Sequence, residues 1–176
     1  MPVLMCLSGL PGVGKSTIAR QLAYKTGALW LWLDEIETAM RASHMQTEDL
    51  ADGGYAAAQA VARRALMQGN DVIADCVNPI ALTRLALREA SHKAGSFHLD
   101  IEFQCSDKEL HQQRVETRVV DLPGWVGPDW AAVQARDYEA FADANLRIDT
   151  AVISIDQAVD RICTASRRLT QENTNV

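Results

Sequence analysis

The 176-residue sequence predicts an α/β fold in which helices cover both faces of a parallel β-sheet. Short apolar segments, typical of buried strands, alternate along the chain with segments whose apolar residues have helical spacing. The first apolar segment, VLMCLS, leads directly into GLPGVGKST, a glycine-rich sequence that precedes a helical segment. A strand, a loop and a helix in this order form the basic unit of a parallel sheet, and ligands of such sheets bind beyond the carboxyl ends of the strands.

The elements follow from the same periodicity. The expected strands cover residues 3–8, 28–33, 71–75, 97–105 and 146–154. The expected helices cover residues 15–26, 34–42, 55–68, 78–94, 106–118, 130–144 and 155–169. Gly27 suits a helix C-terminus, and Ser106 with Glu109 forms a capping box. Residues 45–54 are polar and aperiodic, and residues 121–130 are rich in Pro, Gly and Trp, so both are expected to be connections.

Length and composition indicate a single domain over residues 1–169 with a polar, disordered tail at 170–176. A net charge of −6 argues against a nucleic-acid groove, and no apolar segment approaches membrane-spanning length. The four cysteines form no CxxC pair, which is typical of reduced thiols. We therefore expect a cytoplasmic protein, monomeric or homodimeric, without nucleic-acid or membrane partners.

Residues 9–17, here called the phosphate loop, match the pattern G-x-x-x-x-G-K-[ST]. Its glycines let backbone N–H groups point at phosphate oxygens, and the N-terminus of the following helix adds positive potential. We expect Lys15 to reach the terminal phosphates of ATP and the Ser16 hydroxyl to bind Mg²⁺. The expected nucleotide-binding residues of this loop are Gly9, Leu10, Pro11, Gly12, Val13, Gly14, Lys15, Ser16 and Thr17.

Carboxylates follow two further strands. Asp75 ends the apolar sequence DVIAD and is interpreted as the second Mg²⁺ ligand, the alternative being a turn residue ahead of Asn78-Pro79. Asn78 is either a substrate contact or an N-cap. Asp34 is either the base that accepts a proton from an attacking hydroxyl or, with Glu37, a helix cap.

Arg114 and Arg118 are four residues apart and so share one face of a helix that precedes the Pro- and Gly-bearing connection. They are candidates to close over the phosphates, with a solvated basic stripe as the alternative. Arg41 and Arg84 are candidates to contact the acceptor of the phosphoryl group, with plain surface positions as the alternative.

These residues together resemble the small P-loop kinases, which include AAA-domain, zeta-toxin-like, chloramphenicol phosphotransferase-like and gluconate-kinase-like members. The resemblance covers residues 3–165 and rests on the phosphate loop, on Asp34 and on the sequences DCVNPIALTR, CSDKELHQQRVETR and IDTA. It implies a three-layer fold of the nucleoside-monophosphate-kinase type, with a five-stranded parallel sheet in the order 2-3-1-4-5 and a short lid at about residues 114–130. It also implies ATP and Mg²⁺ as cofactors, an adenine near Arg114 and Thr150, and Asp34 as the catalytic base.

The acceptor is less defined. Polynucleotide kinases and many monophosphate kinases place an Arg one turn after the aspartate, where this chain has Glu37, so a phosphorylated acceptor is disfavoured unless Arg41 binds it. We expect transfer of the γ-phosphate to a hydroxyl of a small molecule such as a sugar, antibiotic or nucleoside. The alternatives are an ATP-binding or ATPase regulatory module without such an acceptor and a 5′-hydroxyl nucleic-acid or nucleotide kinase. Cys76, where a hydrolytic motor carries a carboxylate, favours transfer over hydrolysis.

Overall fold

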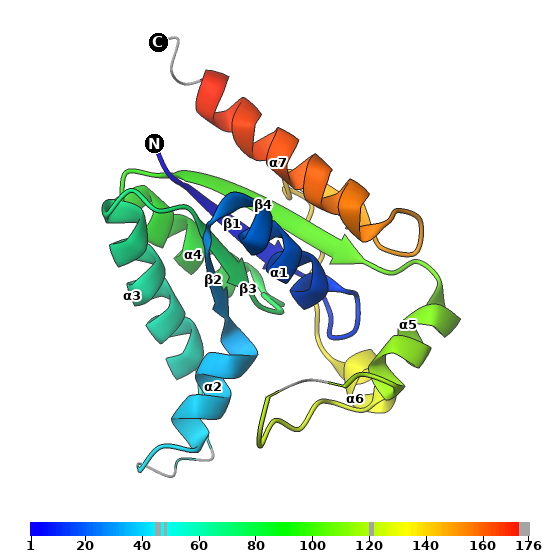
Figure 1. The fold of residues 1–176 in the computed structure, drawn as a ribbon. Helices are drawn as coiled ribbons and strands as arrows, with labels where there is room; N and C mark the ends of the chain where they lie inside the picture. Colours follow the sequence, from blue (N-terminus) through cyan, green and yellow to red (C-terminus); the bar gives the residue numbers. More distant parts are fainter. Residues whose placement is uncertain (45–46, 48, 120–121, 173–176) are drawn as a thin grey trace.

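The structure is a computed structural model that describes residues 1–44, 47, 49–119 and 122–172. These residues form a five-stranded parallel sheet in the order β2-β3-β1-β4-β5, which confirms the expected topology (Figure 1). The strands are β1 (Val3–Ser8), β2 (Leu29–Trp32), β3 (Val72–Asp75), β4 (Phe97–Gln104) and β5 (Leu146–Asp149). The helices are α1 (Lys15–Thr26), α2 (Leu33–Arg41), α3 (Gly53–Met67), α4 (Ala81–Lys93), α5 (Lys108–Glu116), α6 (Trp130–Ala135) and α7 (Ile155–Glu172).

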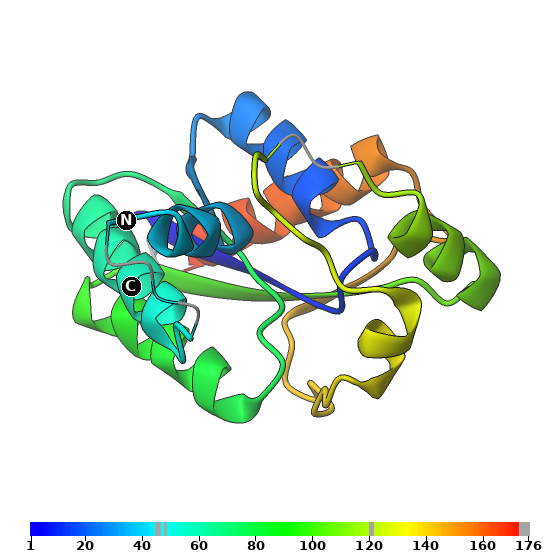
Figure 2. The same ribbon diagram turned by 90° about the horizontal axis from the view of Figure 1, so that it is seen from below.

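Helices cover the sheet on both faces, as Figure 2 shows from below. On one face, Ile18 and Leu22 of α1 and Ile162 of α7 pack on alternate residues of the central strands. On the other face, α3 and α4 pack on the remaining residues of those strands, with Leu66 and Leu87 among the buried contacts. Because both faces of the strands are buried, every residue of β1 and β3 is buried.

The register of the sheet brings the candidate site together at one edge. Leu7 near the end of β1 lies beside Asp75 at the end of β3, and Asp75 lies beside Trp32 at the end of β2. The phosphate loop, Asp75 and the first turn of α2 therefore start from neighbouring points at the carboxyl ends of the three strands.

Three local expectations were wrong at helix starts and at the end of β5, and one alternative, the Asp34–Glu37 capping box, does not form. Helix α4 begins at Ala81 with Ile80 at its N-cap, because Asn78 takes a left-handed backbone conformation (φ 52°) instead of capping. Helix α5 is capped by Asp107, whose carboxylate accepts from Leu110 N, and not by Ser106. Helix α2 has Trp32 at its N-cap and no side-chain cap, so the Asp34–Glu37 capping box does not form. Strand β5 stops at Asp149, because the backbone turns where Asp149 Oδ1 accepts from Ala151 N.

The helix expected over residues 130–144 is also shorter than predicted and ends at Ala135. Arg136 is already extended (φ −71°, ψ 124°), and Tyr138 and Phe141 instead pack their rings against the Arg84 guanidinium. Long-range packing thus overrides the local helical pattern. At the C-terminus, α7 continues to Glu172, three residues into the segment expected as a tail, and residues 173–176 lie outside the described chain.

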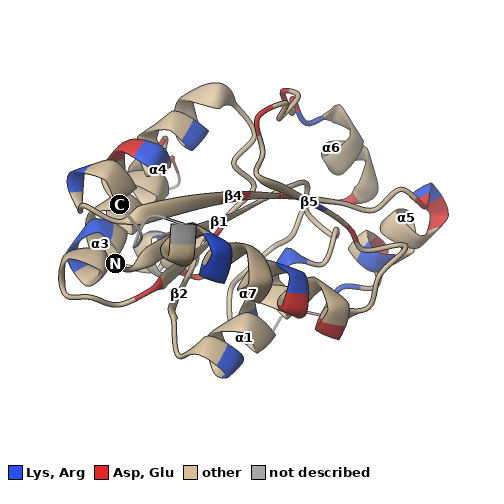
Figure 3. Ribbon diagram, turned by 90° about the horizontal axis from the view of Figure 1, so that it is seen from above, with Lys and Arg blue, Asp and Glu red and all other residues tan. Residues whose placement is uncertain are grey.

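Charged side chains of both signs are distributed over the helices. In the view of Figure 3, α4, α5 and α7 each carry both basic and acidic residues. In the part of the chain that the structure describes, no helix is long and apolar enough to cross a membrane.

Candidate active site

A cavity of about 1180 Å³ opens at the carboxyl edge of the sheet. Its walls come from the phosphate loop, the start of α2, the end of β3, the connection between α5 and α6, and residues 150–155. It brings together most of the site residues expected from sequence. Those that line it are Pro11, Gly12, Gly14, Lys15, Ser16, Thr17, Asp34, Arg41, Asp75, Arg114, Arg118 and Thr150.

The backbone of the phosphate loop depends on glycine at two close approaches. Gly9 has φ 144°, and a Cβ there would overlap the carbonyl oxygen of Phe103 in β4. Gly12 has φ 84°, and a Cβ there would overlap the side chain of Val115 in α5. Since both the backbone angles and the space exclude a side chain, these positions are the least tolerant of substitution in the loop.

Lys15 is held inside the phosphate loop. Its Nζ donates to Gly9 O at 2.7 Å and to Leu10 O at 3.0 Å, and the residue is 8% exposed. Burial lowers the pKa of Lys15, and the nearby Asp75 carboxylate is the main charge that opposes this shift. Backbone carbonyls of the phosphate loop therefore position the Lys15 ammonium.

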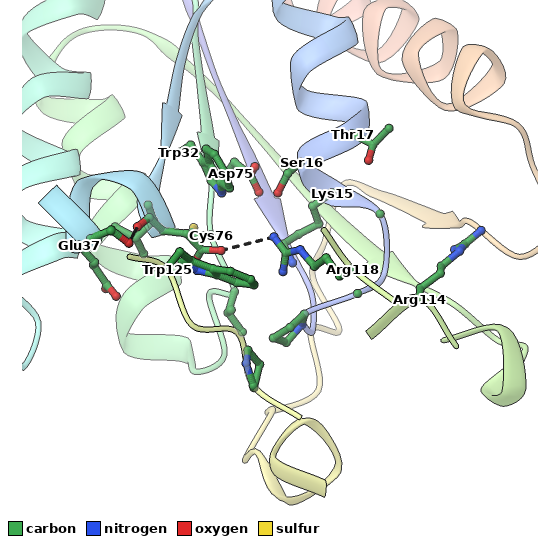
Figure 4. Close-up of a pocket in the computed structure, with 18 of the residues that line it drawn as sticks. Lys15, Ser16, Thr17, Trp32, Glu37, Asp75, Cys76, Arg114, Arg118 and Trp125 are labelled. Atoms are coloured by element: carbon green, nitrogen blue, oxygen red, sulfur yellow. Dashed lines mark hydrogen bonds and ion pairs between the residues drawn. The ribbon is translucent and has the colours of Figure 1, made fainter. Parts of the chain in front are cut away.

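Ser16 and Asp75 face each other at the base of the cavity (Figure 4). Asp75 is 2% exposed, and burial raises its pKa, whereas Lys15 and a hydrogen bond from the Ser16 hydroxyl act in the opposite direction. The Trp30 indole N–H also donates to Asp75 Oδ2 at 3.3 Å. A carboxylate and a hydroxyl beside a phosphate loop are the hard oxygen donors that fit Mg²⁺.

Asp34 projects from the first turn of α2 into the same cavity. Its Oδ2 lies 3.5 Å from Arg118 Nη2, and the two side chains are 35% and 22% exposed. Arg118 in turn lies over the Trp125 ring, with 4.6 Å from Cζ to the ring centroid, and Figure 4 shows these two side chains together. The connection after α5 thus places a cation next to the carboxylate that sequence reasoning selected as the base.

Arg114 occupies a different place from Arg118, on the far side of the phosphate loop (Figure 4). Its guanidinium donates to Thr150 Oγ1 at 2.8 Å and to Thr150 O at 3.2 Å, and the Thr150 hydroxyl donates to Val13 O. Arg114 and Thr150, both expected near the adenine, are thus bonded to each other beside the loop, and Arg114 lies four residues from the arginine that reaches Asp34.

His111 is a contributor to the loop that sequence reasoning missed. Its Nε2 lies 2.8 Å from Pro11 O, and its ring meets the Trp130 ring edge-on at 5.1 Å between centroids. His111 is buried, so it links α5 and α6 to the phosphate loop. Sequence spacing held no signal for this contact, because the two bonded residues are 100 positions apart.

Glu37 and Arg41 form an i, i+4 pair on α2, with 3.4 Å between Glu37 Oε2 and Arg41 Nη2. The Glu37 side chain also packs on Gly54, where a Cβ would overlap it. Both residues line the cavity together with Tyr55 of α3. Arg41 therefore partly offsets the charge of Glu37 where both line the cavity.

Two expected substrate contacts, Arg84 and Asn78, lie outside the cavity lining. Arg84 is 4% exposed, and its guanidinium donates to four backbone carbonyls, those of Asn78, Pro79, Glu139 and Ala140. Asn78 is fully buried and donates from Nδ2 to Ser8 Oγ at 3.1 Å. Arg84 is therefore neither at the surface nor in contact with the cavity where an acceptor was expected. Arg84 and Asn78 instead bond to the chain behind the site.

Cys76 takes the place at which a hydrolytic carboxylate would stand. It is buried, lines the cavity and donates from its backbone N–H to Leu7 O. Burial is the largest cause of a raised pKa at Cys76, and the Asp75 charge adds to it, so the residue stays a thiol at neutral pH. Such a group does not act as a base toward water.

The sequence matches the AAA domain family over residues 4–122, which is more than half of the chain. This chain belongs to the AAA domain family. Comparison with curated protein sequences finds no match. The fold of this AAA-domain protein is that of the P-loop kinases. The family match and the phosphate loop together indicate a nucleotide-binding module.

Solved structures similar to this AAA-domain protein include three from different organisms. A gluconokinase from Sinorhizobium meliloti has a TM-score of 0.68 and 18% identity, over 98% of this chain and 96% of the other. The APS kinase of Mycobacterium tuberculosis, in complex with AMPPNP and APS, has a TM-score of 0.68 and 17% identity over 93% and 96%. Kti12 of Chaetomium thermophilum, in complex with ADP-AlF3, has a TM-score of 0.66 and 21% identity over 93% and 98%.

Proposed function

We propose that this protein transfers the γ-phosphate of ATP to a hydroxyl group of a small molecule. The observation that carries the proposal is the position of Asp34. Its carboxylate does not cap helix α2, lines the same cavity as Lys15 and Ser16, and lies beside Arg118. A carboxylate in this position can accept the proton of a hydroxyl that attacks the terminal phosphate. The similar structures of kinases support the fold on which this chemistry depends.

In the proposed reaction, the phosphate loop holds the triphosphate, and the Lys15 ammonium turns from the loop carbonyls to the terminal phosphates. Ser16 and Asp75 would hold Mg²⁺, which supplies positive charge to the phosphate oxygens. Arg118 moves its contact from Asp34 to the transferred phosphoryl group, so the Asp34 carboxylate becomes free to take the hydroxyl proton. The acceptor oxygen forms a bond to the γ-phosphorus as the bond to the β–γ bridging oxygen breaks, and ADP leaves.

An ATPase module without an acceptor is the second candidate, and one observation weighs against it. Beyond Asp75 the chain offers the Cys76 thiol, which burial keeps protonated, where hydrolysis needs a base for water. We therefore expect ADP formation to be slow with ATP and Mg²⁺ alone and to increase when an acceptor is added.

The test is acceptor-dependent ADP formation with pooled hydroxyl compounds, measured for the wild type and for Asp34→Asn. Loss of a general base lowers turnover by about 10²- to 10⁴-fold. Asp156→Asn, at an exposed position in the first turn of α7, is the matched control and should retain turnover. The proposal fails if no pool increases ADP formation, and the role of Asp34 fails if Asp34→Asn turns over an acceptor at the wild-type rate.

A further inference from the structure

Among the residues that the structure describes, the arginines that line the cavity differ in their contacts. Arg41 pairs with Glu37, Arg118 with Asp34, and Arg114 binds Thr150. Arg136 also lines the cavity, but among the described residues no side chain or carbonyl lies within bonding distance of its guanidinium. Within the described part of the chain, Arg136 is therefore a positive charge at the cavity without a counter-charge.

Arg136 is presented by a backbone segment that is fastened on its C-terminal side. Glu139 N donates to Pro79 O at 2.8 Å, and the Glu139 carboxylate accepts from Ala81 N at 2.6 Å. The buried Arg84 guanidinium binds Glu139 O at 2.7 Å in addition. These contacts hold the segment against the start of α4 only three residues after Arg136, so the position of Arg136 at the cavity is set by the fold.

Tyr55 provides a hydrogen-bond donor in the same region. Its hydroxyl oxygen accepts from Asn78 N at 3.0 Å, and no described residue accepts its proton. Burial raises the pKa of Tyr55, so the phenol remains a donor at neutral pH. Tyr55 and Arg136 both line the cavity, and Tyr55 binds Asn78 while the segment that follows Arg136 binds Pro79, the next residue in the chain. A cation and an O–H donor without an acceptor form the kind of site that binds an oxyanion.

We propose that Arg136 and Tyr55 bind an oxyanion on the acceptor, so that the substrate is a hydroxyl compound that also carries a carboxylate, phosphate or sulfate group. The identity of the oxyanion as part of an acceptor rests on the proposed function, whereas the binding of an oxyanion by these two residues does not. Glu37, whose charge also acts on Tyr55, is itself paired with Arg41 at 3.4 Å. The proposed acceptor is thus anionic, and Arg136 takes the binding role that the sequence offered to Arg41.

The binding test does not require turnover. Protein saturated with AMP-PNP and Mg²⁺, which occupy the phosphate loop, is titrated with sodium sulfate against sodium chloride of equal ionic strength, and tryptophan fluorescence is followed because Trp32 and Trp125 line the cavity. Arg136→Gln should weaken sulfate binding by about tenfold or more, because a charge-assisted contact is lost. Tyr55→Phe should weaken it less, and Arg63→Gln, at an exposed position on α3, should not change it. AMP-PNP affinity in the same samples reports whether each variant is folded.

The substrate test compares matched pairs of compounds. Glycerate is compared with glycerol, gluconate with glucitol, and glucose 6-phosphate with glucose, so that carboxylate and phosphate sources are separated. We expect turnover of acidic members and a KM that rises about tenfold or more in Arg136→Gln, with a smaller change in kcat. Absent sulfate binding, or equal binding by wild type and Arg136→Gln, overturns the oxyanion site. Sulfate binding that depends on Arg136, without turnover of any acceptor, retains the site and rejects the transferase.

Discussion

Replacing Arg84 by alanine should destabilise the protein strongly, although sequence reasoning placed this residue at the surface or against a substrate. The guanidinium is 4% exposed, donates to four backbone carbonyls and lies 4.1 Å from the Phe141 ring centroid and 5.1 Å from that of Tyr138. Its removal leaves carbonyl oxygens without donors and two rings without their packing partner.

The magnitude follows from these contacts. A buried polar group left without its partner costs about 1–3 kcal/mol, but the costs are not additive and water reaches the three part-buried carbonyls. We therefore expect Arg84→Ala to lower the free energy of unfolding by about 3–5 kcal/mol, within the range for large losses at buried, bonded positions. For a chain of this length each kcal/mol lowers Tm by roughly 2–4 °C, so Tm should fall by roughly 6–20 °C.

Urea denaturation and thermal unfolding, followed by circular dichroism, measure this loss. Arg84→Lys should recover less than half of it, because a lysine ammonium does not reproduce the fork of donors that spans several carbonyls. Arg63→Ala, at an exposed position on α3, is the control and should change stability by less than about 0.5 kcal/mol. A loss below about 1 kcal/mol for Arg84→Ala would refute the stabilising role assigned to the contacts of Arg84.

Three further predictions concern the site and the thiols. Lys15→Ala should weaken ATP binding by roughly tenfold to a hundredfold, measured by calorimetry against Lys93→Ala, since a charged donor to phosphate is lost; equal affinities would contradict the assigned role. Asp75→Asn should raise the Mg²⁺ concentration for half-maximal turnover by roughly tenfold or more, because a carboxylate ligand becomes neutral; an unchanged Mg²⁺ titration would remove Asp75 from the metal site. Burial raises the pKa of three thiols, those of Cys6, Cys76 and Cys163. A higher pKa leaves less thiolate at pH 8, so an aromatic disulfide reagent should modify the half-buried Cys105 first and the other three only after unfolding; rapid modification of several thiols in the folded protein would show that the burial is incorrect.

The strands, helix α1 and the phosphate loop were predictable because they depend on local patterns, whereas the order of the sheet was implied by the resemblance to the small P-loop kinases. Continuous apolar strands, segments with apolar residues at helical spacing, and a glycine pattern between β1 and α1 can each be recognised in consecutive residues. Helix α1 begins at Lys15 and ends at Thr26 as expected, and Gly27 caps it with φ 73°. The same reasoning failed for α6, because aromatic rings beyond Ala135 find a better partner in Arg84 than a further helical turn offers.

The roles of the arginines were not predictable in this way. In the sequence, Arg84 and Arg136 are both charged residues near helical segments, with nothing to distinguish them. In the structure, Arg84 is buried among backbone carbonyls, whereas Arg136 is exposed at the cavity wall. Which of them contacts ligand depends on where chain segments some fifty residues apart meet, as Arg84 and Glu139 do.

The sequence by itself determined that the protein has a phosphate loop at the edge of a parallel sheet, since glycine, lysine and serine at fixed spacing define that loop. Only the tertiary structure decided what surrounds it. Arg118 contacts Asp34, and His111 contacts Pro11, although these residues are far apart in the chain. The packed chain likewise places Arg136 in the cavity wall, where no described residue supplies a counter-charge. The physical reason is that the burial and pairing of charges depend on how distant segments pack, so local periodicity in the sequence does not predict them.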